Sequence, residues 1–63
     1  MALKNNGELV RKTLDLLIER AENFEDLQTV KFAIDDYMDE GYFVLMQIQN
    51  YNDKVNKFYA KRN

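Results

Sequence analysis

Apolar residues in the first third of the chain recur every three or four positions, as they do on one face of an α-helix. Asn5 can cap the start of this helix, and Glu8 stands three residues later as a capping-box partner. Leu9 and Leu16 widen the apolar face, so the helix is expected to contact neighbours on two sides. The pattern predicts a helix over residues 6–22, with a face made of Val10, Leu14, Leu17, Ile18 and Ala21.

The first helix is expected to end near Asn23. If its apolar stripe continued through Phe24, polar residues would follow on the buried line, whereas the apolar line restarts at Leu27. Asn23 is a favourable N-cap, and the next two acids, Glu25 and Asp26, suit the positive end of a helix dipole. This change of phase predicts a turn at Asn23 and a second helix after it.

From Leu27 onward the apolar positions follow a heptad repeat. Its a positions are Leu27, Ile34, Gly41, Ile48 and Val55, and its d positions are Val30, Tyr37, Val44, Tyr51 and Phe58. The e positions include Met38, Leu45 and Tyr59, where a two-stranded coiled coil prefers charge. An a/d/e stripe is typical of a bundle helix. The predicted oligomer core is Val30, Ile34, Tyr37, Gly41, Val44, Leu45, Ile48, Tyr51, Val55 and Phe58.

Gly41 is the one a position without a side chain, and it allows two architectures. A glycine can end a helix by taking the left-handed conformation at the C′ position. Against a break, no Ser, Thr, Asp or Asn follows directly to cap a new helix, and the heptad keeps its phase through position 41. We therefore predict one continuous helix over residues 24–60, with a bend at Gly41 as the alternative.

The predicted fold class is all-α, a single domain over residues 1–63 in which a short helix is hairpinned onto a long helix. Oligomerisation is expected to complete an antiparallel helical bundle. Residues 19–40 are strongly acidic and both flanking segments are basic, although the net charge is only −2. The expected charge pairs are Arg11 and Lys12 with Asp35, Asp36 and Asp39, and Lys57 and Lys61 with Glu25 and Glu22. This pairing arises from a bend at Gly41 or from two straight helices of different copies.

Composition favours self-association and excludes several kinds of chemistry. The chain has 63 residues and neither cysteine nor histidine, so neither a disulfide nor a Cys/His zinc site can stabilise it. Domains of this size usually need such a staple, and oligomerisation is the remaining common one. The absence of Ser, Cys and His removes the usual nucleophile–base pairs, so we expect no enzyme, cofactor or metal. The longest apolar run, residues 42–46, is too short for a membrane span, so a cytoplasmic protein is expected.

A second apolar face is the candidate protein-binding site. Tyr42, Phe43 and Met46 point away from the heptad stripe, and Phe32 lies further back along a similar face. Such a surface binds another protein, or it is buried beneath the first helix or a second copy. Burial is the more common outcome, but the sequence alone leaves both alternatives open.

Two charged clusters are weaker candidates. The acidic cluster, Asp35, Asp36, Asp39 and Glu40, recognises a basic partner or forms a solvated face neutralised by Arg11 and Lys12. The basic cluster, Lys54, Lys57 and Lys61, lies among aromatic residues, as in sites for single-stranded nucleic acid. Nucleic acid is the less favoured partner because the chain is acidic overall and the aromatic residues occupy core positions.

These features predict a small acidic, non-enzymatic regulator or inhibitor that works by helix-mediated protein binding. In style the chain is similar to small helical inhibitors such as antitoxins, immunity proteins and phage-encoded anti-host factors. Residues 33–50, which begin Ala33-Ile34-Asp35-Asp36-Tyr37-Met38, resemble the last helix of phage anti-CBASS cyclic-nucleotide sponges, mainly in helical periodicity. This resemblance covers under a third of the chain and implies no binding residue. The alternatives are a structural protein that only forms its own oligomer, and a nucleotide or nucleic-acid binder.

Overall fold

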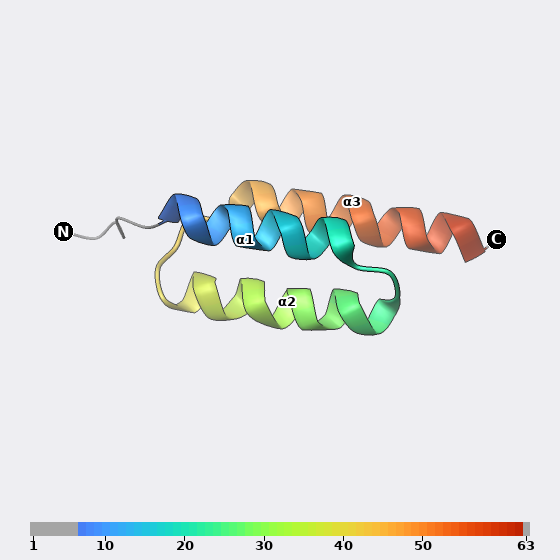
Figure 1. Ribbon diagram of the computed structural model, residues 1–63, viewed down its shortest axis with the longest axis horizontal. Helices are drawn as coiled ribbons and strands as arrows, with labels where there is room; N and C mark the ends of the chain where they lie inside the picture. The colour runs from blue at the N-terminus through green and yellow to red at the C-terminus, as the bar shows by residue number, and fades with distance from the viewer. Residues whose placement is uncertain (1–6, 63) are drawn as a thin grey trace.

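In the computed structural model, which describes residues 7–62, the chain forms three helices that all contact one another. They are α1 (Gly7–Arg20), α2 (Phe24–Asp39) and α3 (Leu45–Arg62). Figure 1 shows that α1 and α3 run side by side in the same direction, while α2 runs along them in the opposite direction. The prediction of an all-α fold is confirmed.

The turn between α1 and α2 lies where the phase change predicts it. The Asn23 side chain caps α2, because its Oδ1 accepts a hydrogen bond from the backbone N–H of Asp26 at 2.7 Å. Asp26 reciprocates, since its Oδ2 accepts from the backbone N–H of Glu22 at 2.9 Å. Lys54 of α3 satisfies the other side of the turn by donating to the carbonyl oxygen of Glu19 at 3.0 Å. The predicted N-cap of the first helix, Asn5, lies outside the described residues.

The prediction of one continuous helix over residues 24–60 is wrong, and the alternative bend at Gly41 is what the structure shows. Gly41 has a φ of 101° and ends α2 in a Schellman motif. The backbone N–H of Tyr42 donates to the carbonyl of Tyr37 at 3.0 Å, and the N–H of Gly41 donates to the carbonyl of Met38 at 3.0 Å. The Tyr37 and Tyr42 rings meet edge to face at 5.5 Å, which supplies the apolar contact that accompanies this motif.

Both arguments against the bend have a physical answer in the structure. The backbone of Val44 caps α3 without a polar side chain, since its carbonyl accepts from the N–H of Ile48 at 3.0 Å. Arg11 of α1 holds the preceding residue, because its Nη1 donates to the carbonyl of Phe43 at 3.3 Å. The heptad keeps its phase because α2 and α3 each turn an apolar stripe of the same spacing toward the bundle interior.

The buried core runs along the axis shared by the three helices. In the described part of the chain, the buried apolar side chains are Val10, Leu14, Ile18, Ala21, Leu27, Val30, Ile34 and Val44. Partly buried residues that pack against this core are Ala33, Tyr37, Tyr42, Ile48 and Tyr51. α1 supplies a full stripe as predicted, although Leu17 is exposed on the α2 side of that stripe.

The residues predicted to form an oligomer core mostly pack within a single chain. Val30, Ile34 and Val44 are buried there, and Tyr37, Ile48 and Tyr51 lie against them. Val55 and Phe58 are half-buried, whereas Gly41 and Leu45 are exposed. Because these residues already pack within one chain, the predicted oligomer is not needed to bury the heptad stripe. A dimer that exchanged α3 between two copies would make the same contacts.

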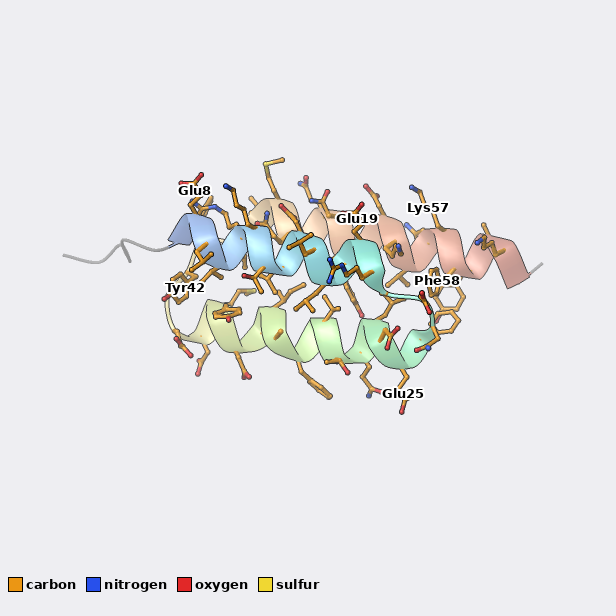
Figure 2. The ribbon with its side chains drawn as sticks, in the orientation of Figure 1. Glu8, Glu19, Glu25, Tyr42, Lys57 and Phe58 are labelled. Atoms are coloured by element: carbon orange, nitrogen blue, oxygen red, sulfur yellow. The ribbon has the colours of Figure 1, made fainter. Side chains whose placement is uncertain are left out.

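The expected charge pairs between helices do not form among residues 7–62. Lys12 pairs with Glu8 on its own helix at 3.8 Å, and Arg11 bonds to a backbone carbonyl instead of to a carboxylate. Figure 2 shows Lys57 and Glu25 on opposite sides of the bundle. The acidic outer face of α2 is therefore not neutralised by α1 as expected.

Replacing Gly41 with L-alanine is expected to lower the free energy of unfolding by about 1–2 kcal/mol. An added Cβ meets no atom within 4 Å, so the cost comes from the positive φ alone. D-alanine at position 41 is the matched control, because it carries the same methyl group and prefers positive φ. A chemically synthesised pair is compared by urea unfolding at one protein concentration. Equal losses from both enantiomers would contradict the turn.

Two neighbouring leucines on α1 test the core. Leu14 is 0% exposed and Leu16 is 50% exposed, so the same truncation creates a cavity only at the first. Leu14→Ala is expected to lower the free energy of unfolding by about 2–5 kcal/mol, and Leu16→Ala by less than about 1 kcal/mol. Similar losses in thermal or urea unfolding would show that the core is placed wrongly.

Candidate protein-docking surface

The stretch from Gly41 to the middle of α3 carries no charge. Residues 41–52 contain no Asp, Glu, Lys or Arg, although 32% of the chain is charged. Depletion of charge together with enrichment in aromatic residues and Met is the compositional signature of the centre of a protein–protein interface. The surface made by this stretch is therefore a candidate docking site.

Four large apolar side chains are exposed around the turn between α2 and α3. We call this set, Met38, Phe43, Leu45 and Met46, the hairpin patch. Phe43 is 70% exposed and Met46 is 68% exposed, which makes them the two most exposed large apolar side chains that the structure describes. Met38, Phe43 and Leu45 line an open depression of about 310 Å³ together with the buried Val44 and the partly buried Ile48, whereas Met46 does not line it.

The Schellman turn decides which side chains enter the patch. It directs Tyr42 inward against Tyr37, so the residue after it, Phe43, faces outward (Figure 2 shows Tyr42 at this end of the bundle). Arg11 fixes that arrangement through the carbonyl of Phe43. The backbone therefore presents Phe43 in a defined direction at the tip of the bundle.

The predicted protein-binding residues are only partly brought together. Phe43 and Met46 belong to the hairpin patch, while Tyr42 is half-buried and helps to close the turn. Phe32 is exposed on the outer face of α2, separate from the patch. Sequence reasoning missed Met38 and Leu45 as surface residues because it placed both on the buried stripe of one long helix.

Two residues of the charge-free stretch, Gln47 and Asn50, form a polar cluster with Asp15 of α1. Gln47 is only 5% exposed, and its Nε2 donates to Oδ1 and Oδ2 of Asp15 at 3.2 and 3.4 Å. Asn50 donates to the same Oδ1 at 3.3 Å. The buried Oε1 of Gln47 has no hydrogen-bond partner in the described part of the chain. The hydrogen bonds of this cluster fix the position of α3 along α1, although they leave the Oε1 acceptor of Gln47 unsatisfied.

A second depression lies at the opposite end of the bundle. Its volume is about 450 Å³, and its lining residues are Ala21, Glu22, Asn23, Phe24, Lys54, Phe58 and Lys61. Phe24 contacts Phe58 edge to face at 5.6 Å, and the Lys54 ammonium lies 5.9 Å from the centre of the Phe58 ring. We call this feature the basic cavity. Of the predicted basic cluster, Lys54 and Lys61 line it and Lys57 does not.

Comparison of the chain with known families, curated proteins and solved structures gives no significant match. No helix in the described part is long and apolar enough to cross a membrane. Within residues 7–62, no three carboxylates come close enough together to hold a metal ion.

Gln47→Met is expected to leave the free energy of unfolding unchanged or to raise it by up to about 1 kcal/mol. The thioether fills a similar volume and removes the unsatisfied acceptor, while Asn50 still donates to Asp15. Gln49→Met, on the exposed side of α3, controls for the change in helix propensity. A loss well above 1 kcal/mol in urea unfolding would mean that the bond from Gln47 to Asp15 outweighs the unsatisfied oxygen.

Proposed function

We propose that the chain is a small non-enzymatic regulator that acts by binding another protein through the hairpin patch. The observation that carries the proposal is the coincidence of two features at one place: the most exposed large apolar side chains and the longest charge-free stretch. Exposed apolar residues scattered singly need no explanation, whereas a group of them beside a depression marks a binding surface.

The chemistry of the patch defines its partner. The residues of the patch carry no charge, so a charged side chain on the partner would find no opposite charge there. It would lose its hydration on binding without compensation. The uncharged apolar face of a helix satisfies this requirement, since its side chains can enter the depression between Met38 and Leu45. The thioethers of Met38 and Met46 adapt to irregular surfaces, and Phe43 is the rigid anchor.

The fold supports this mode of binding. Phe43 and Met46 make little contact with the rest of the chain, so they contribute to binding without being needed for folding. The tip that presents them is held by the Schellman turn and by Arg11, which lowers the conformational entropy lost when a partner docks. A regulator of this size needs no catalytic residue, because occupying a surface of its target is sufficient to block or reposition that target.

Photo-crosslinking at two exposed apolar positions tests the proposal. Benzoylphenylalanine replaces Phe43 in one variant and Leu16, which is 50% exposed on α1, in the control. In the cells that produce the chain, the Phe43 variant is expected to form an adduct with one other polypeptide, and the Leu16 variant is not. Adding Met46→Asp to the Phe43 variant is expected to reduce that adduct at least tenfold, as for loss of a hot-spot residue.

Two results would contradict the proposal. Equal adduct formation at positions 43 and 16 would show that any exposed crosslinker reacts with other polypeptides, whether or not it lies in the hairpin patch. Adducts at position 43 that contain only a second copy of this chain would show that the patch is an interface between copies. The thermal midpoints of all variants are measured in parallel, so that loss of the fold is recognised as such.

A further inference from the structure

The outer face of α2 carries one exposed aromatic side chain, Phe32, with acidic residues around it. We call Phe32 the knob. Phe32 is 60% exposed and lies half a turn away from the buried residues Val30 and Ile34. Asp36 and Asp39 stand four and seven residues after it, on the same side of the helix. Figure 2 shows Glu25, seven residues before it, also on the outward side of α2.

Two of the acids beside the knob, Asp36 and Asp39, are not neutralised within residues 7–62. Among the described residues, Asp35 pairs with Lys31 at 3.3 Å, and no ion pair is formed by Asp36 or Asp39. Like charges that are kept close together on a helix destabilise it slightly, so an external basic surface would relieve a local repulsion. An exposed ring with an acidic rim fits a partner that has an apolar hole with a basic rim.

The basic cavity at the α1–α2 turn has those properties. Phe24 and Phe58 provide aromatic walls, and Lys54 and Lys61 place two ammonium groups against a single carboxylate, that of Glu22. Its volume of about 450 Å³ is large enough to admit one phenyl ring. Knob and cavity lie on different parts of the molecule, so one chain does not fill its own cavity with Phe32.

We propose that the chain associates with a second copy of itself by inserting Phe32 of one copy into the basic cavity of the next. This interface is separate from the hairpin patch, so it is independent of the proposed binding of another protein. Because each copy carries one knob and one cavity, the contact is between unlike patches and either closes into a ring or continues from copy to copy. An interface centred on one ring and its rim buries little area, so association is expected to be transient.

Two disabled variants test this geometry. The knob variant is Phe32→Ser, which removes the ring, and the cavity variant is Lys61→Glu, which reverses the rim charge at an exposed residue. Sedimentation equilibrium and light scattering follow the mass of each chain from about 10 µM to 1 mM, the range of a transient interface. The unmodified chain is expected to grow beyond the 7.5 kDa monomer with concentration, and less so at high salt.

Each variant alone is expected to stay monomeric over that range. An equimolar mixture is expected to form a heterodimer and nothing larger, because the knob variant keeps its cavity and the cavity variant keeps its knob. Far-UV circular dichroism and the thermal midpoint show that both variants are folded. Phe43→Ser is the matched control at the hairpin patch, and it is expected to associate like the unmodified chain.

Three results would overturn the proposal. The first is an unmodified chain that remains monomeric throughout the concentration range. The second is association of either folded variant alone to the same extent as the unmodified chain. The third is a mixture of the two variants in which no heterodimer forms.

Discussion

The left-handed turn at Gly41 is the constraint on which the rest of the structure depends. With a φ of 101° at this one residue, α3 folds back along α1 and α2 and completes their core within a single chain. An L-residue with a side chain would resist that conformation, and a continuous helix would leave the apolar stripe of its second half without an intramolecular partner. The turn also places Tyr42 inside and Phe43 outside, so one backbone feature determines both the core and the main candidate surface.

Much of the fold could be predicted from periodicity and capping. Asn23 combined a change of apolar phase with a capping side chain, and both signals pointed to the same turn. Gly41 offered only the glycine, because the cap of α3 comes from backbone groups and from Arg11 in a distant segment. A heptad that keeps its phase does not distinguish one long helix from two shorter helices that both pack against α1. The same positions face the core in both architectures.

The candidate surfaces were only partly predictable for the same reason. Phe43 and Met46 lie outside the heptad stripe, but the sequence pattern left open whether the first helix or a second copy covers them, and only the structure shows that both are exposed in the single chain. Met38 and Leu45 lie on the stripe and become exposed only because the helix ends between them. The basic cavity requires α3 to approach the α1–α2 turn, a long-range contact that no local pattern contains. A bundle of this size has too little interior to bury its large apolar residues fully, and four of the nine that are exposed in the described part of the chain form the hairpin patch.

The distance between α2 and α3 within one molecule tests the central claim most directly. Lys31 and Asn52 line the same depression, and a chain without cysteine allows both to be replaced by uniquely spin-labelled cysteines. In a continuous helix these residues would lie about 32 Å apart at 1.5 Å per residue. Pulsed electron paramagnetic resonance, with excess unlabelled chain to suppress distances between copies, is expected to show one short distance well below that value. A distribution centred near 32 Å would contradict the turn at Gly41 and the surfaces that depend on it.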